Sequence, residues 1–294
     1  MRLAVVSDIH GNLPALEAVL AEVRGEHVDR VVNLGDIVSG PLWPRETAAL
    51  LRAMSWSTIR GNHERQLLAL PADRMGPADA FARARLAEED LHWLAALPAT
   101  LDLGDGVWCC HGTPASDLQY FLETVTPDLD RDGSPGVRAA TAAEVADRLG
   151  AVTAPLVLCG HTHMPRAAQC GGTLVVNPGS VGLPAFDDDH PHAHRMETGS
   201  PHARWALVER AAAGWQVQQR LTAYDWEFAA QRAEHKDRGD WADALRTGRV
   251  GLGVRLSGLM VQPDRHSQER RHQGLLLRLR HGGRREGPPA EHAP

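Results

Sequence analysis

The chain begins with MRLAVVSDIHGN (residues 1–12), and this stretch indicates the class of fold. Residues 3–7 are apolar up to a final serine, as in a buried strand, and a polar turn that contains Asp8 and His10 follows at once. Residues 14–24 then show the spacing of an amphipathic helix. A strand that ends in a polar turn and leads into a helix is typical of α/β proteins with parallel strands.

The same alternation continues beyond this stretch. The pattern predicts further strands at 31–34, 57–59 and 156–158, and helices at 46–54, 64–70, 78–97 and 142–149. Short apolar runs around glycine-containing turns predict hairpins at 101–110, 169–176 and 205–221. Parallel units followed by hairpins predict either two sheets or one mixed sheet, covered by helices.

The composition changes near residue 250. We therefore expect a domain at 1–249 and an Arg-rich, poorly ordered tail at 250–294. A short helix at 275–279 is the alternative for part of this tail. The tail holds eight arginines against four acidic residues, although the whole chain has a net charge of −6. Because nucleic-acid phosphates require a positive surface, we do not expect residues 1–249 to bind nucleic acid. The tail is the one basic segment that would favour a nuclease.

Composition excludes several other classes of protein. The 294 residues are 43% hydrophobic and 23% charged, which suits a globular chain, and they contain no apolar run long enough to span a membrane. The four cysteines suggest no disulfide framework, and Cys109, Cys110 and Cys159 are expected to be buried. No secretory signal is apparent, so we expect a cytoplasmic protein.

Polar motifs follow the ends of five predicted strands. They are Asp8-x-His10, Gly35-Asp36, Gly61-Asn62-His63-Glu64, His111-Gly112 and Gly160-His161-Thr162-His163. Residues beyond the carboxyl ends of strands line the binding crevice of an open α/β sheet, so these groups should meet at one rim. The set offers nitrogen and oxygen ligands without thiolate, which suits Mn²⁺, Fe or Zn²⁺. It is large enough for two ions, and two ions can clamp the attacking and leaving oxygens at phosphorus.

Each motif alone has a structural explanation. Asp-x-His and Gly-Asp are common in turns, and Asn62 could cap a helix. The interpretation as a metal site therefore depends on all five motifs occurring together, in order, at strand ends.

Together the five motifs resemble those of the calcineurin-like metallophosphoesterase superfamily. Gly35 to Gly40-Pro41 and Asn177-Pro178-Gly179-Ser180 are similar to its small prokaryotic branch of phosphodiesterases and diadenosine-tetraphosphatase-like enzymes. The similarity covers residues 1–245. It implies a four-layer αββα sandwich with two mixed β-sheets and a dinuclear metal site at the carboxyl ends of the strands.

The resemblance also implies roles for individual residues. One ion would be held by Asp8, His10, Asp36 and His163, and the other by the bridging Asp36 with Asn62, His111 and His161. His63 would act as general acid for the leaving oxygen. A metal-bridging water that becomes hydroxide near neutral pH would attack the phosphorus in line. Manganese is the metal we expect for both ions, with Fe, Zn²⁺, Ni²⁺ and Co²⁺ as alternatives.

The resemblance therefore implies a phosphoric ester hydrolase acting on a phosphodiester or phosphomonoester, with a nucleotide-type substrate favoured. The alternatives are a Ser/Thr-type protein phosphatase, a dinucleoside polyphosphate hydrolase, and a non-catalytic scaffold on the same fold. Protein phosphatases carry an arginine after the second aspartate, but Asp36 is followed by Ile37-Val38-Ser39-Gly40-Pro41.

Position in the sequence suggests four substrate contacts, which are Asn12, Arg65, Arg166 and Trp43. We expect the partner to be a small phosphorylated substrate and not a membrane, and a homo-oligomer is left open. The His- and Asp-rich segment 187–194 is interpreted as a solvated loop that could act as a lid, with a second metal site as the alternative.

Overall fold

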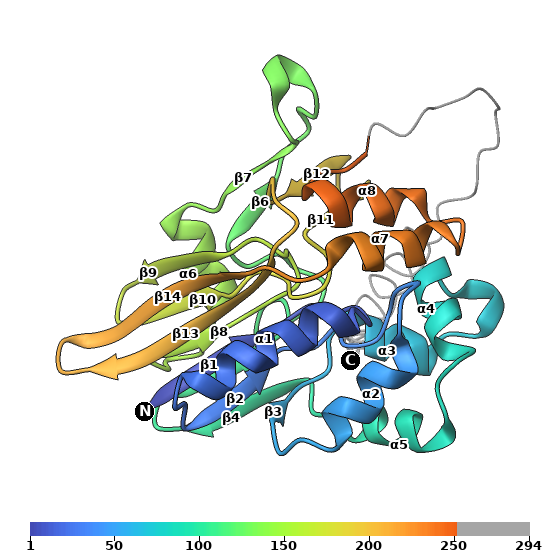
Figure 1. Ribbon diagram of the computed structural model, residues 1–294. Coiled ribbons are helices and arrows are strands. Elements are labelled where there is room, and N and C mark those ends of the chain that lie inside the picture. Colours follow the sequence, from blue (N-terminus) through green and yellow to red (C-terminus); the bar gives the residue numbers. More distant parts are fainter. Residues whose placement is uncertain (252–294) are drawn as a thin grey trace, which may run out of the picture. The chain divides into compact units, whose positions relative to one another are not determined.

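A computed structural model describes residues 1–251 of the chain (Figure 1). The predicted tail from residue 252 onward, with its short helix at 275–279, lies outside the described residues. No helix among residues 1–251 is long and apolar enough to cross a membrane.

Two five-stranded mixed sheets form the centre of the fold. The first sheet has the strand order β14 (Gly214–Thr222), β13 (Ala203–Ala211), β1 (Arg2–Val6), β2 (Arg30–Asn33) and β3 (Ser57–Thr58). The second has the order β4 (Thr100–Gly104), β5 (Val107–Cys110), β8 (Leu156–Leu158), β10 (Thr173–Asn177) and β9 (Arg166–Cys170). In each sheet, three adjacent strands run parallel, namely β1, β2 and β3 in the first and β5, β8 and β10 in the second.

Helices complete the layers. They are α1 (Leu13–Gly25), α2 (Pro44–Arg52), α3 (Asn62–Ala69), α4 (Pro77–Arg83), α5 (Glu88–Ala96), α6 (Ala142–Leu149), α7 (Trp226–Glu234) and α8 (Gly239–Thr247), with 3₁₀ turns at Ala72–Arg74 and Arg131–Gly133. Asn12 caps α1 by accepting a hydrogen bond from the backbone N–H of Ala15. Figure 1 shows α1 lying along the sheet that contains β1 and β13.

Alternation along β1 shows how the layers are built. Ala4 and Val6 pack in the hydrophobic cluster with α1, whereas Leu3 and Val5 pack on the opposite face with β5 and β8 of the second sheet. The outer face of the second sheet packs against Val145 of α6. This arrangement of helices, sheet, sheet and helix confirms the predicted four-layer sandwich.

The predicted helix at 78–97 is wrong as a single element, because residues 84–87 separate α4 from α5. Asp90 explains the second start, since its carboxylate accepts a hydrogen bond from the backbone N–H of Ala87 at 2.9 Å and so caps α5.

Two short hairpins were not predicted. They are β6 (Glu123–Val125) with β7 (Val137–Ala139) and β11 (Ala185–Asp188) with β12 (His194–Glu197). The pair α7 and α8 was not predicted either.

Candidate metal centre

The five motifs lie where the sequence placed them, directly after β1, β2, β3, β5 and β8. Their backbone is unusual, because five of the predicted ligands have a left-handed conformation. The φ values are 54° for Asp8, 51° for His10, 54° for Asp36, 70° for His161 and 58° for His163. Aspartate and histidine adopt this conformation more readily than most residues, and five others do so outside the motifs, so the feature of interest is that five such residues gather in three neighbouring loops.

One group of candidate ligands consists of Asp8, His10 and His163, whose ligand atoms lie within 4.8 Å of one another. Nε2 of His10 is 3.1 Å from Nε2 of His163, which is 3.4 Å from Oδ1 of Asp8. That carboxylate oxygen is buried and has no hydrogen bond within the described residues. Because a buried oxygen without a partner is costly, the geometry suits a cation between these atoms.

A second group consists of Asp36, His111 and His161, again with ligand atoms within 4.8 Å of one another. Nε2 of His111 lies 3.0 Å from Oδ2 of Asp36 and 3.1 Å from Oδ1 of Asn62, which brings the amide of Asn62 to this group. The same nitrogen is 3.9 Å from Oδ1 of Asp8, so the two groups are neighbours.

Backbone carbonyls orient all four imidazoles. The partners are Ser39 O for Nδ1 of His10 at 2.8 Å, Leu34 O for Nδ1 of His111 at 2.7 Å, Leu183 O for Nδ1 of His163 at 2.7 Å, and Leu118 O for Nε2 of His161 at 3.2 Å. A ring nitrogen that donates its hydrogen to a carbonyl leaves the other nitrogen as a lone-pair donor. Metal-bound histidines are typically held in this way, so the donor set fits divalent cations.

The pKa values in this protein without metal reflect the same crowding. Burial opposes ionisation of Asp8 and Asp36, but neighbouring histidines outweigh it and lower the pKa of both carboxyls. Burial lowers the pKa of His10 to about 3 and that of His161 to about 4, so both rings are neutral at pH 7. His111 differs, because Asp36 outweighs the effect of burial and raises its pKa to about 10.

Glu64 connects two of the ligand loops, a role that we did not assign from the sequence. Its buried carboxylate accepts hydrogen bonds from the backbone N–H groups of Asp36 at 2.8 Å, Ile37 at 2.8 Å and Gly61 at 2.9 Å. The signal was present in the sequence, since a glutamate three residues after Gly61 is a capping-box position.

His63 lies beside the two ligand groups. Its backbone N–H donates to Oδ1 of Asp36 at 3.0 Å, and its ring is 5.4 Å from the ring of His10 in an edge-to-face arrangement. Nδ1 is 2.7 Å from Oδ1 of Asp79. Burial lowers the pKa of His63, but Asp79 and Asp36 outweigh it and raise the pKa to about 10.

The four predicted substrate contacts have partners within the protein. Asn12 is buried, and its NH₂ group donates to Gly182 O at 2.9 Å and to the Tyr224 hydroxyl at 3.1 Å, so neither amide hydrogen is left for a substrate phosphate. The ring of Trp43 stacks on Phe228 of α7 at 5.1 Å.

The two predicted arginines each face a carboxylate. Arg65 forms a two-pronged ion pair with Asp117, at 2.6 and 3.0 Å. Nε of Arg166 is 2.7 Å from the buried carboxylate of Glu123. A substrate phosphate would therefore have to compete with a carboxylate for either guanidinium group.

Other polar and open features do not join the centre. Within residues 1–251, segment 187–194 contains no candidate metal group, and His194 is buried with its Nε2 2.9 Å from the hydroxyl of Tyr120. Cys109, Cys110 and Cys159 are buried as expected.

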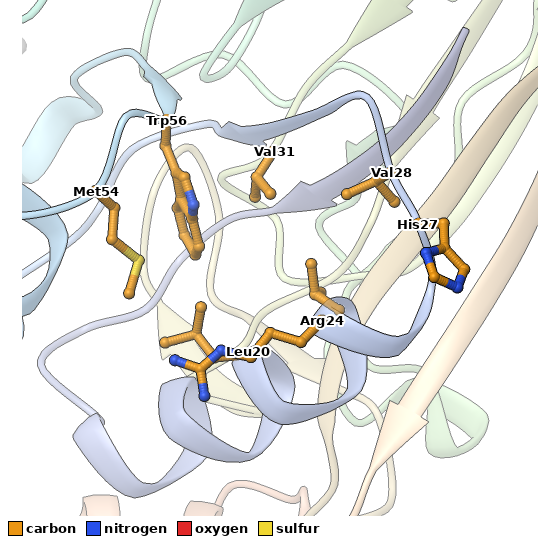
Figure 2. A pocket seen from close by; sticks show the side chains of 8 residues that line it. Leu20, Arg24, His27, Val28, Val31, Met54 and Trp56 are labelled. Atoms are coloured by element: carbon orange, nitrogen blue, oxygen red, sulfur yellow. The ribbon is translucent and has the colours of Figure 1, made fainter.

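A groove of about 310 Å³ lies between α1, β2 and the segment after α2 (Figure 2). Its lining is mainly apolar and contains no predicted site residue. Its residues are Leu20, Val23, Arg24, His27, Val28, Val31, Met54 and Trp56.

Comparison with known proteins gives a family match and similar structures. A family model described as "Calcineurin-like phosphoesterase superfamily domain" matches residues 1–200. "Uncharacterized protein MJ0912" of Methanocaldococcus jannaschii is 27% identical, with 62% of this chain and 76% of that protein covered.

Two solved structures are similar over most of the chain. A metallophosphoesterase from Sphaerobacter thermophilus is 26% identical with a TM-score of 0.64, covering 84% of this chain and 99% of that one. Hypothetical protein PH1004 from Pyrococcus horikoshii OT3 is 20% identical with a TM-score of 0.66, covering 85% and 99%. At 20% identity, the likeness to the Pyrococcus protein shows a shared fold alone.

Proposed function

Because this chain belongs to the calcineurin-like phosphoesterase superfamily, we propose that it is a metal-dependent phosphoric ester hydrolase acting at the centre described above. The convergence of two neighbouring groups of ligands, buried except for the partly exposed His161, with four imidazoles each aligned by a carbonyl, carries the proposal. Carboxylate, amide and imidazole ligands without thiolate suit Mn²⁺, which we propose as the metal, with Fe, Zn²⁺, Ni²⁺ and Co²⁺ as alternatives.

We propose one ion for each of the two ligand groups. One ion would be held by Asp8, His10 and His163, the other by Asn62, His111 and His161, and Asp36 would serve both. Bound there, the ions would stabilise negative charge that develops on the phosphoryl group and lower the pKa of a bound water.

His63 is the proposed general acid. Hydrolysis adds water to phosphorus and breaks the bond between phosphorus and the leaving oxygen, which keeps the electron pair and needs a proton. With Nδ1 against Asp79, Nε2 is the ring nitrogen that can supply this proton, and solvent then restores it. The products are an alcohol and a phosphate, or a phosphomonoester when the substrate is a diester.

We propose a small phosphodiester or phosphomonoester of nucleotide type as the substrate. Residues 1–249 hold 23 basic and 33 acidic side chains, which disfavours a long polyanion. Dinucleoside polyphosphates and phosphoproteins are the alternative substrates. Phosphoproteins are disfavoured because Asp36 is not followed by the arginine expected of protein phosphatases. A non-catalytic scaffold is disfavoured because every proposed ligand position is occupied by a suitable side chain.

A substrate panel tests the proposal. Manganese-loaded protein would be assayed with p-nitrophenyl phosphate, bis-p-nitrophenyl phosphate, nucleotides, dinucleoside polyphosphates and phosphopeptides. We expect turnover of at least one nucleotide-type ester, and the preferred member of the panel then identifies the substrate class. Metal-loaded protein that hydrolyses none of these compounds would contradict the proposal and favour the scaffold.

A further inference from the structure

An ion pair between Arg65 on α3 and Asp117 joins two segments that serve the second ligand group. Nε and Nη2 of Arg65 lie 2.6 and 3.0 Å from the two carboxylate oxygens of Asp117. We propose that Arg65 and Asp117 are positioning residues, whose ion pair holds α3 and the segment after β5 at the spacing that the second metal ion requires. The inference rests on the proposed function, because it assigns the pair a part in binding one of the two proposed ions.

On α3, Arg65 lies close to a proposed ligand. It follows Asn62 by three residues, and residues at this spacing are neighbours on one side of a helix. Oδ1 of Asn62 is 3.1 Å from Nε2 of His111, which places the start of α3 at the second group. A contact that fixes Arg65 therefore also fixes the helical turn that carries Asn62.

After β5, Asp117 directly precedes the residue that orients His161. The backbone carbonyl of Leu118 is 3.2 Å from Nε2 of His161, so Nδ1 is the nitrogen left for a metal ion. This part of the chain is compact, because the backbone N–H of Leu118 donates to Oγ of Ser116 at 3.2 Å and a Cβ at Gly112 would be 2.5 Å from Ser116 O. Holding Asp117 in place therefore also holds the carbonyl that orients His161.

Two other roles explain the pair less well. The side chains of Arg65 and Asp117 are 30% and 25% exposed, and ion pairs that remain open to solvent add little to the stability of a fold. A contact between Arg65 and a substrate phosphate would need the nitrogens that Asp117 already occupies. Within residues 1–251, this ion pair is the only one that segment 112–119 makes, so it is the charged link between that segment and the rest of the described chain.

Calorimetric titration of the metal-free full chain with Mn²⁺ tests the inference without relying on activity. We expect Arg65→Ala and Asp117→Ala each to weaken the binding of one ion by about 10-fold and to leave the other nearly unchanged, because only the second group loses its support. The double variant should lose no more than either single variant, since both remove the same contact. Arg138→Ala is the matched control, because Arg138 forms a similar two-pronged pair with Glu144, away from the ligand-bearing segments.

Exchanging the charges separates the pair from its individual members. In the double variant Arg65→Asp with Asp117→Arg, the ion pair can form again, so part of the lost Mn²⁺ affinity should return. A phosphate contact predicts a different pattern, in which Arg65→Ala raises KM and leaves both Mn²⁺ affinities unchanged, and the exchanged variant gains nothing. That pattern would overturn the inference.

The remaining outcomes separate this inference from the proposed function. Equal weakening of both ions in Arg65→Ala would indicate a general loss of structure and would overturn the role assigned to the pair. A wild type that binds two ions, with Arg65→Ala and Asp117→Ala variants that bind them equally well, would overturn this inference alone. A wild type that binds no Mn²⁺ would overturn the proposed function and this role with it.

Discussion

Gly61 lies against the side chain of Asp36, at a position where no other residue fits. A Cβ atom at Gly61 would be 2.1 Å from Oδ1 of Asp36, which is far inside van der Waals contact. Gly160 is similar, since its Cβ would be 2.0 Å from Oγ of Ser7 and 3.0 Å from Oδ2 of Asp8. These glycines allow the loops to approach the carboxylates closely, which is why glycine accompanies the ligand motifs.

We therefore expect Gly61→Ala to displace Asp36, to weaken metal binding, and to lower the free energy of unfolding by about 1–3 kcal/mol. Denaturant unfolding and metal analysis by mass spectrometry measure the two effects. Gly172→Ala is the matched control, because a Cβ at Gly172 meets nothing within 4 Å and the backbone there is not left-handed. Equal behaviour of the two variants would show that Gly61 does not set the position of Asp36.

His111 makes metal binding dependent on pH. With a pKa raised to about 10, chiefly by Asp36 against the opposing effect of burial, the ring is protonated at pH 7 in the metal-free protein. A metal ion must displace this proton, whereas His10 and His161 are already neutral. The apparent affinity should therefore rise by ~10-fold per pH unit between about pH 6 and pH 8. Calorimetry in buffers of different ionisation enthalpy measures the released proton, and an affinity independent of pH would contradict the assignment.

The sequence predicted some residues of the site and not others. The polar motifs were found because each directly follows a strand, and parallel strands bring their carboxyl ends to one edge. Asp79 and the carbonyl partners of the histidines could not be found in this way. They depend on how α4 and the segments after β2, β5 and β10 pack around the rings, and no local pattern specifies such contacts.

Among the elements, the N-terminus of α3 and the loop after β2 act as one unit, because Glu64 joins them through three backbone N–H groups. In Glu64→Gln, an NH₂ group replaces one accepting oxygen and faces a backbone donor. We expect the free energy of unfolding to fall by about 1–3 kcal/mol, together with metal affinity. Glu88→Gln on α5 is the control, since the Glu88 side chain is 86% exposed. A Glu64→Gln variant as stable as that control would contradict the structural role of this carboxylate.

Elements with strong local patterns were predicted well. Continuous apolar runs mark the strands β1, β2, β5 and β8, and helical spacing marks α1. These elements belong to both sheets and to one of the outer helical layers. The hairpins β6–β7 and β11–β12 have strands of only three or four residues, too short for a periodic signal. The helix predicted at 78–97 was divided by the cap at Asp90, which depends on a single side chain.

Within residues 1–251, the buried carboxylates of Asp8 and Asp36 lie close enough to affect each other's ionisation. Bound cations would relieve this repulsion, so metal binding should stabilise the fold. With free metal at about 100 times its dissociation constant, the gain is about 2.7 kcal/mol. For a domain of this size we expect chelation to lower Tm by about 5–10 °C. Scanning calorimetry measures this shift, and equal Tm values with and without chelator would contradict metal binding in the folded state.

The proposed function requires this fold to hold two metal ions. The direct measurement is the number of manganese ions per chain in a purified sample, together with its hydrolysis of bis-p-nitrophenyl phosphate. Asp36→Asn serves as the matched variant, because its amide oxygen can still accept from the backbone of His63. We expect two ions and metal-dependent turnover in the wild type, with both largely lost in Asp36→Asn. A wild type that binds no manganese, or that binds two ions and hydrolyses no phosphoester, would contradict the proposed function.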